Sequence, residues 1–563
     1  MRRLKWSKKS YPWVLFTFFL IVYLLYPTNL PYIDGLYYSY HIEHMPLADT
    51  FHPHHLLFLT ITQIIYSIAH YLFDSLRGLQ FYQSLNSLLA ALTLIYIYKL
   101  LLEIFKKPAG AFLGTFFYGS TFGFWHHATD ANIYISFNLL LTILLTRYLL
   151  DKDSLMRSRI ISTALLLAFA TMIHQLAFFL LFPFGAHYLK KNNDSRSGIK
   201  AAGLFFTVYI MSVAIPYILA FLQVVGQDEI SISNFAKWVT AYGSNRNFWP
   251  ILLHDIYYCV GMVARSQFES LYHIIPAQII IFRGLQTGEN TSLTNLHSFV
   301  MALILMLMIE RIHFINFRAT DEQKALYRKV FLWMLPYFVF FGFFAPENYF
   351  YRIFYLAPLI IFGGGLIESS TLHDKKNIKP YAFVFVIFTF LYNGYDGIIP
   401  ESKTKNNPFI VSAGKIHNAI GEDDLVIFAD KERYLAACFR YYFDREALHA
   451  LSRLRYKVEN PEDIKNAKYE TVKFLSEKYS GIYLTSTARE MGVNTYYFSL
   501  NNMIPPHPEI MLMEKDQLIQ QDYLDYHSGV LFKVKLTEPN EGMISEDAVT
   551  QFRETIAPLL PIR

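Results

Sequence analysis

A short polar island follows the first long apolar run of the chain and holds the residues best suited to chemistry. It contains Asp34 and, further along, His52-Pro53-His54-His55. An acid and several histidines at the mouth of a membrane helix cost desolvation free energy, so they mark a functional site. A carboxylate fixed there on a tight loop can act as a general base toward a hydroxyl group, because exclusion of water brings its pKa toward the working pH. The alternative for Asp34 is a solvated loop aspartate.

Two further polar breaks interrupt later apolar runs. The stretch from Phe124 to Tyr134 contains His126, His127 and Asp130, and His174 separates two half-length apolar runs. We expect Asp130 to act together with Asp34, as a base, a positioning group or a ligand of one divalent metal. The alternative is that Thr129 or Asp130 caps the next helix. His126 and His127 suit contact with phosphate oxygens or a metal, and equally an ordinary hydrogen bond at the interface.

Arg352 enters a later apolar run from a polar stretch that also holds Glu347. A guanidinium there can clamp a phosphate with two parallel hydrogen bonds, or pair with Glu347 at the interface. His52 and His54 flank a proline, an awkward geometry for metal chelation by one helix face. We expect them to line a substrate cavity with His174. Three more polar residues of the first loop are expected to be ordinary loop residues: Glu43, His44 and Asp49.

Composition places these residues in a polytopic membrane protein. The chain has 563 residues, 53% of them hydrophobic and 17% aromatic, and its apolar residues come in blocks of membrane-spanning length. The formal net charge of +5 is modest, and basic residues flank the apolar blocks. Their expected partners are therefore the head groups of the lipid bilayer, and no nucleic acid is expected as a partner. The N-terminal segment reads as an uncleaved signal-anchor.

The distribution of basic residues decides the topology. The segment 56–73 is apolar, but the positive-inside rule is satisfied when it lies along the membrane as a juxtamembrane helix. We then expect 28–79, 125–131, 225–293 and 395–563 on the outer face. About eleven segments remain as predicted spans: 11–27, 80–104, 109–124, 132–150, 159–173, 175–189, 200–224, 294–313, 329–345, 352–369 and 380–394.

After about residue 395 the composition changes to that of a soluble domain. Strand patterns alternate there with helical ones, which predicts a small α/β domain. The strands are expected at 424–429, 481–485 and 529–534, and the helices near 431–456 and 461–479. We therefore predict an α-helical polytopic membrane domain over 1–394 and a C-terminal, extracytoplasmic α/β domain over 395–563.

Three stretches resemble the GT-C superfamily of polytopic glycosyltransferases, especially protein O-mannosyltransferases and their bacterial relatives. Asp34, followed by His52-Pro53 before an apolar helix, is similar to the family's catalytic acid and its His-Pro element, although His54-His55 replaces the usual Pro-Gly or Pro-Leu. The stretch ending in Asp130 is similar to the second outer loop of these relatives, where the acid is commonly Glu. Met172 to Gln175 is similar to a polar break in some of them. The resemblance covers about residues 11–225.

The resemblance implies an enzyme, a GT-C-type hexosyltransferase. It would transfer a sugar from a polyprenyl-phosphate-linked donor to an acceptor on the extracytoplasmic face, which we expect to be that of the bacterial inner membrane. Asp34 would deprotonate or orient the acceptor hydroxyl, Asp130 would assist, and Arg352, with His126 and His127, would hold the donor phosphate. The acceptor (protein, lipid or glycan) and a divalent metal shared by the two acids stay open. The alternative is a membrane transporter or flippase, or a non-catalytic assembly protein of envelope polysaccharide biogenesis, in which the acid and histidines would relay protons.

Overall fold

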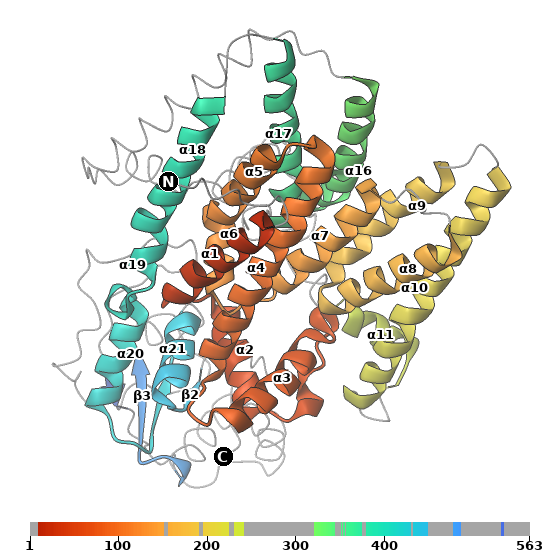
Figure 1. The fold of residues 1–563 in the computed structure, drawn as a ribbon. Helices are drawn as coiled ribbons and strands as arrows, with labels where there is room; N and C mark the ends of the chain where they lie inside the picture. The colour runs from red at the N-terminus through yellow and green to blue at the C-terminus, as the bar shows by residue number, and fades with distance from the viewer. Residues whose placement is uncertain are drawn as a thin grey trace, which may run out of the picture. The chain divides into compact units, whose positions relative to one another are not determined.

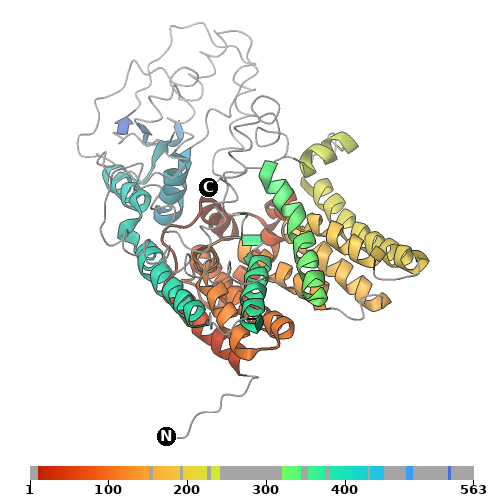
Figure 2. The ribbon, with the colours of Figure 1, turned by 90° about the horizontal axis from the view of Figure 1, so that it is seen from above.

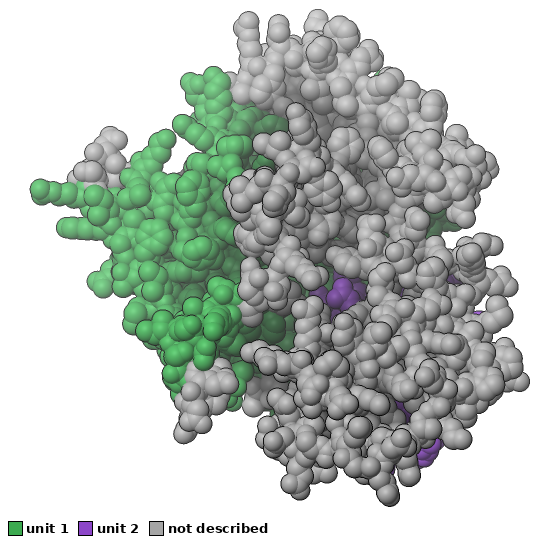
Figure 3. Space-filling model, turned by 180° about the vertical axis from the view of Figure 1, so that it is seen from behind, with its two compact units in different colours: residues 1–28, 38–402 green, residues 29–37, 403–563 purple. Residues whose placement is uncertain are grey.

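The computed structural model describes residues 10–150, 156–190, 195–224, 230–240, 320–343, 351, 353–354, 356–373, 379–428, 432–448, 477–485 and 531–533. These residues are mostly helical (Figure 1). The chain divides into two compact units, one made of Met1–Thr28 with Tyr38–Ser402 and the other of Asn29–Tyr37 with Lys403–Arg563 (Figure 3). Each unit is described by itself.

The helices of the first unit follow the predicted apolar runs. In order they are α1 (Tyr11–Leu25), α2 (Ile33–His44, whose last residues belong here), α3 (Phe58–Leu72), α4 (Gly78–Phe105), α5 (Pro108–Ser120), α6 (Phe122–Thr129), α7 (Tyr134–Leu150), α8 (Arg157–Ile173), α9 (Leu181–Lys190), α10 (Ser195–Val224), α11 (Ile232–Val239), α16 (Asp321–Phe343), α17 (Leu356–His373), α18 (Lys379–Tyr392) and α19 (Ile399–Glu401). Short 3-10 helices occur at Leu47–Thr50, Pro53–His55 and Gln175–Leu180, and a π-helix spans Asn393–Ile398.

Several of these helices have the length and surface of membrane spans. Within the described residues, three helical runs are long and apolar enough to cross a membrane: Gly78–Phe105, Arg196–Val224 and Pro380–Glu401. α10 exposes large apolar side chains, among them Met211 and Leu219, as expected of a helix that faces lipid. The protein is therefore an integral membrane protein. The number of spans stays a prediction, because the expected span 294–313 lies outside the described residues.

α4 lies at the centre of the first unit and packs against α1, α5, α6 and α7. Its side chains are apolar around most of the helix, and Tyr82, Leu94 and Leu100 are fully buried. A helix that is apolar on every face suits the core of a bundle. α8 and α9 lie beside α10 in a second group of helices (Figures 1 and 2).

Two predicted spans are interrupted in the structure. The expected span 109–124 ends at Ser120, and Thr121, with extended backbone angles, separates it from the short helix α6. The expected span 175–189 begins as a 3-10 helix before α9. Both breaks lie beside polar side chains that sequence analysis assigned to the site.

The second unit contains a four-stranded sheet of order β2-β1-β3-β4. β1 (Asp424–Ile427) runs parallel to β2 (Ala447–Leu448) and β3 (Gly481–Thr485), and β4 (Leu531–Lys533) runs antiparallel to β3. The helices α20 (Pro408–Ala419) and α21 (Arg433–Phe443) pack against each other. All three predicted strands are present.

The predicted helix 431–456 is wrong at residues 444–448, and residues 449–456 lie outside the described residues. Asp444 has a left-handed backbone (φ 49°), which ends α21, and the chain returns as β2 to pair with β1. The predicted helix 461–479 lies almost entirely outside the described residues. The domain limits 1–394 and 395–563 stay predictions.

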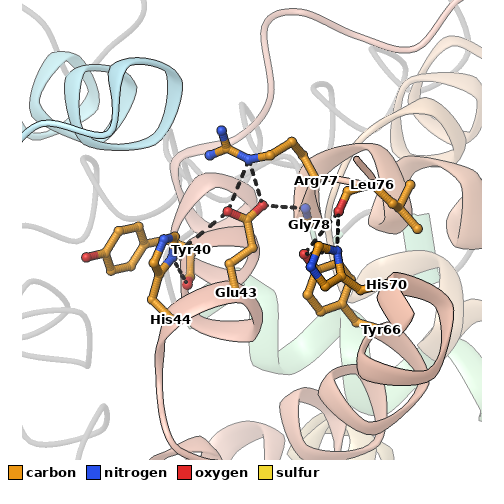
Figure 4. A network of polar contacts seen from close by, with 8 residues as sticks. All are labelled: Tyr40, Glu43, His44, Tyr66, His70, Leu76, Arg77 and Gly78. Atoms are coloured by element: carbon orange, nitrogen blue, oxygen red, sulfur yellow. Dashed lines mark hydrogen bonds and ion pairs between the residues drawn. The ribbon is translucent and has the colours of Figure 1, made fainter. Parts of the chain in front are cut away.

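Glu43 fastens the helix α2 to the start of α4 (Figure 4). Its carboxylate accepts hydrogen bonds from the backbone N–H of Gly78 and from Arg77 Nε, the latter at 3.2 Å to each oxygen. A carboxylate at a helix N-terminus satisfies an amide and opposes the helix dipole. On α3, Tyr66 Oη donates to Leu76 O at 3.0 Å, which fixes the turn before α4. The expectation that Glu43 is an ordinary loop residue is therefore wrong.

Gly78 is expected to tolerate no side chain. A Cβ there would lie 2.7 Å from Ser39 O, a backbone atom, and 3.0 Å from Glu43 Oε1. We expect Gly78→Ala to lower the free energy of unfolding by about 1–3 kcal/mol, the usual cost of overpacking, and to lower the thermal unfolding temperature in detergent. The control is Gly203→Ala on α10, where nothing lies within 4 Å of the added Cβ, and where alanine favours the helix. Equal unfolding temperatures for the two variants would contradict this account.

Candidate active site

Asp34 lies in the second unit, in the first turn of α2. The expectation of a tight loop at this position is wrong, because the helix begins at Ile33. The turn that starts it is closed by a hydrogen bond from Gly35 N to Tyr32 O at 2.9 Å. An acidic side chain in the first turn is favoured by the exposed amides of the helix N-terminus. The carboxylate is thus fixed by regular secondary structure.

The segment that carries Asp34 is anchored inside its unit by two hydrogen bonds. Tyr434 Oη on α21 donates to Pro31 O at 2.6 Å, and Asn407 Nδ2 donates to Asn29 O at 2.7 Å. Both donors belong to the part of the chain that follows residue 402. The segment before α2 is therefore held by residues far along the sequence, a contact that no local signal predicts.

Asp34 keeps access to solvent, although the surrounding protein removes much of its hydration. This desolvation raises the pKa of the Asp34 carboxyl above its usual value, and the guanidinium of Arg433 opposes the rise. A carboxylate with a raised pKa is a stronger base than an ordinary aspartate, as proton abstraction from a hydroxyl requires. Sequence analysis did not single out Arg433.

Asp130 is fully buried in the first unit, in the turn between α6 and α7. Its Oδ1 accepts a hydrogen bond from Ala131 N at 2.7 Å, and its Oδ2 lies 3.4 Å from Asn132 Nδ2. Asn132 Oδ1 in turn accepts from Tyr134 N, the first residue of α7, at 2.9 Å. Asn132, rather than Thr129 or Asp130, therefore supplies the cap at the start of this helix.

Polar side chains of α4 hold the same turn from the other side. Asn86 Nδ2 donates to the backbone oxygens of Asp130 and Asn132 at 2.7 and 2.8 Å, and Ser87 Oγ donates to Ala128 O at 3.0 Å. Buried carbonyl groups need such donors because no water reaches them. The turn is thus rigid, and it fixes where α6 presents its histidines.

His126 is buried on α6 and forms an ion pair with Glu401, with 2.8 Å between Nδ1 and Oε2. Burial lowers the pKa of His126, but the charge and hydrogen bond of Glu401 and the charge of Asp130 outweigh it, so the pKa lies above its usual value. The ring of the fully buried His127 lies beside it, with 5.9 Å between centroids. Sequence analysis missed Glu401, which is 275 residues away in the chain.

A second group of histidines is neutral. The rings of His52 and His54 lie 5.3 Å apart, and His55 packs edge-on against His174 at 4.7 Å. Burial, with smaller effects from neighbouring histidines, lowers the pKa of His52 to about 4 and that of His174 to about 3, and that of His55 well below its usual value. Among the described residues, no group of three or more His, Cys, Asp or Glu side chains is arranged to hold a metal ion.

Ring contacts join the two histidine groups through Tyr134. Its ring lies 5.0 Å from that of His127 and 6.3 Å from that of His174, which also stacks on Phe137 at 4.8 Å. The structure therefore brings the predicted histidines of the first unit into one continuous aromatic cluster. Arg352, the predicted phosphate clamp, lies outside the described residues. Asp34 and Asp130 belong to different units, so their pairing stays a prediction.

Two solved structures share this fold. The crystal structure of ArnT from Cupriavidus metallidurans bound to undecaprenyl phosphate matches with a TM-score of 0.56 and 9% identity, over 95% of this chain and 100% of that chain. The structure of the same ArnT in the apo state matches with a TM-score of 0.53 and 10% identity, over the same shares. No family model and no curated protein sequence matches the chain.

The chain therefore has the fold seen in ArnT. The fold implied by the resemblance of Asp34 and the His-Pro element is confirmed. The closer likeness to protein O-mannosyltransferases stays a prediction.

The lowered pKa of His52 predicts a specific pH dependence of stability. Between pH 6.5 and about 4 the unfolded chain binds a proton at His52 and the folded chain does not, so stability falls as the pH falls through this window. We expect His52→Gln to reduce the loss of unfolding free energy between pH 7 and pH 5 by about 2 kcal/mol, measured by thermal unfolding in detergent. The matched control is His44→Gln, at an exposed histidine of α2. A parallel pH profile for the His52 variant and the parental protein would refute the assignment.

Proposed function

We propose that this protein is a membrane glycosyltransferase that takes a sugar from a polyprenyl-phosphate-linked donor and passes it to an acceptor hydroxyl on the extracytoplasmic face. The observation that carries the proposal is the fold shared with ArnT over nearly the whole chain, in a structure that holds undecaprenyl phosphate. The acceptor is a protein, a lipid or a glycan. We place the protein in the bacterial inner membrane, with residues 395–563 outside the cytoplasm.

Asp34 is the general base of the proposed reaction. The acceptor oxygen bonds to the anomeric carbon as the bond from that carbon to the phosphate oxygen breaks, and the bonding electron pair stays on the phosphate. The proton of the acceptor hydroxyl passes to the Asp34 carboxylate, and the configuration at the anomeric carbon inverts. The raised pKa and solvent access of Asp34 support this role.

The leaving phosphate gains negative charge and needs hydrogen-bond donors and positive charge around it. We assign this work to His126, His127 and Arg352, and the raised pKa of His126 favours its charged form. Asp130 assists as the buried counter-charge of His126. A divalent metal shared by Asp34 and Asp130 is a separate hypothesis, which transfer in the presence of a chelator tests.

The neutral histidines suit the sugar. His52, His54 and His174 have lowered pKa values because of burial, and a neutral imidazole both donates and accepts a hydrogen bond. Sugar hydroxyls need both kinds of partner. We therefore assign these three rings to the substrate cavity.

The test is transfer by the purified protein in lipid nanodiscs. It would be given a panel of undecaprenyl-phosphate sugars, each with a labelled sugar, together with membrane and periplasmic extracts as acceptors. The expected result is movement of label from the lipid carrier to an acceptor for at least one sugar. Binding of undecaprenyl phosphate without transfer of any sugar would instead favour the transporter or flippase alternative.

Replacing the proposed base separates chemistry from folding. Asp34→Asn keeps the size of the side chain and its hydrogen bonding but removes the basic carboxylate, so we expect sugar transfer to fall about a hundredfold or more. The thermal unfolding temperature should stay close to that of the parental protein. The matched control is Asp74→Asn, at an exposed aspartate before α4. Transfer at the parental rate by the Asp34 variant would make Asp34 a structural residue.

Removing the neighbouring cation should move the pH profile of the reaction. Arg433 lowers the pKa of Asp34, so in Arg433→Gln this pKa rises and the carboxylate forms only at higher pH. We expect the acid limb of kcat/KM to shift upward by about one pH unit. Lys415→Gln, at an exposed lysine of α20, serves as the control for loss of a positive charge. An unchanged acid limb in the Arg433 variant would show that Asp34 does not set the profile.

A further inference from the structure

The helix that begins as α18 changes its geometry before it ends. Sequence analysis predicted that this span ends at residue 394. The structure instead continues through the π-helix Asn393–Ile398 into α19, which ends at Glu401. π-Helical turns are rare and occur mostly at functional sites. The π-helix Asn393–Ile398 is therefore expected to position a functional side chain.

Packing against α6 maintains the π-helix. Asn393 Nδ2 donates to Ser120 O at 2.8 Å, and a Cβ on Gly397 would lie 2.6 Å from Phe122 Cε2. Only glycine fits at this close approach. Just before the π-helix, Phe390 stacks on Trp125 with 5.2 Å between ring centroids. The wide turn thus lies directly against the helix that carries His126.

The consequence of the wide turn is the direction of Glu401. One extra residue in a helical turn rotates every later side chain by about 100° around the axis. With that rotation, Glu401 Oε2 lies 2.8 Å from Nδ1 of His126. The bond is made by a buried ring and a partly buried carboxylate, and hydrogen bonds between charged groups are stronger than neutral ones, especially away from water.

We propose that Glu401 is a positioning residue for sugar transfer, which binds the Nδ1–H of His126 and so leaves Nε2–H as the atom that donates to the donor phosphate. This inference rests on the proposed function. A carboxylate that binds one ring nitrogen fixes the orientation of the imidazole and determines whether the other nitrogen donates or accepts a hydrogen bond. The same division of labour occurs in the histidine of serine proteases.

The groups around His126 support a charged ring. Glu401 on α19 and Asp130 at the end of α6 both raise the pKa of His126, and His127 lies beside it. α1 and α5 carry no charged residue. On the π-helix, which also packs against α6, Asp396 accepts a hydrogen bond from Tyr392. The charged residues of α4 and α7 lie about 18 Å or more along the helix axes from their contacts with this region. They are Lys99, Glu103 and Arg147.

The test is a double-mutant cycle read out by binding of undecaprenyl phosphate in nanodiscs, without transfer. We expect Glu401→Gln to weaken binding about tenfold at pH 7. In the His126→Gln background the same change should have no further effect. The pH at which half the affinity is lost should fall in Glu401→Gln, because the ring loses its proton more readily. A purely structural role would leave that pH unchanged.

Asp396→Asn is the matched control, because Asp396 lies on the same π-helix and bonds Tyr392 instead of a histidine. Its affinity for undecaprenyl phosphate should equal that of the parental protein. Independent effects of Glu401→Gln and His126→Gln, or an unchanged pH midpoint, would overturn the inference. Should Glu401→Gln fail to fold, Glu401→Asp replaces it, because this variant keeps the charge but places it one methylene further from His126. Parental affinity for undecaprenyl phosphate in that variant would also overturn the inference. If the parental protein neither binds nor transfers, the proposed function itself has failed.

Discussion

The first unit depends on a row of polar side chains buried along α4. These side chains donate hydrogen bonds to backbone oxygens of two segments that precede and follow this helix in the chain. A membrane interior offers no water to such carbonyl groups, and each one left without a donor costs free energy comparable to a lost hydrogen bond. The donors and their acceptors are Gln83 to Thr28, Asn86 to Asp130 and Asn132, and Ser87 to Ala128. If α4 carried only apolar side chains, the carbonyl groups of the α6–α7 turn would lack these hydrogen-bond donors, and burying the turn against α4 would cost free energy.

Within the same unit, histidine side chains have pKa values shifted in opposite directions. His126 has a carboxylate within hydrogen-bonding distance and a raised pKa, whereas burial, with smaller effects from neighbouring histidines, lowers the pKa values of His52 and His174. Burial alone disfavours a charged imidazole, and a nearby carboxylate reverses that effect. In the proposed reaction, the charged histidine would serve the anionic phosphate and the neutral histidines the uncharged hydroxyls of the sugar.

Much of the helical framework was predictable from the sequence, but few of the side-chain contacts between distant segments were. Apolar runs located α1, α4 and α10, and the polar break at His174 is confirmed between α8 and the 3-10 helix. Arg433 and Glu401 were missed because each reaches its partner across hundreds of residues. The π-helix was missed because Asn393-Gly394 is a turn signal by itself, and only the contact of Gly397 with Phe122 makes a helix there. Local propensity yields to tertiary packing at such points.

The polar row on α4 also dictates an order of events during synthesis. α4 leaves the ribosome before residues 128–134 do, and it holds the side-chain donors that this turn needs. A nascent chain that inserted the turn first, or that inserted α4 in another rotation, would expose unpaired carbonyl groups to lipid. An α4 that already lay in its final orientation when the turn arrived would offer these donors at once, and so act as a template for the segments that follow.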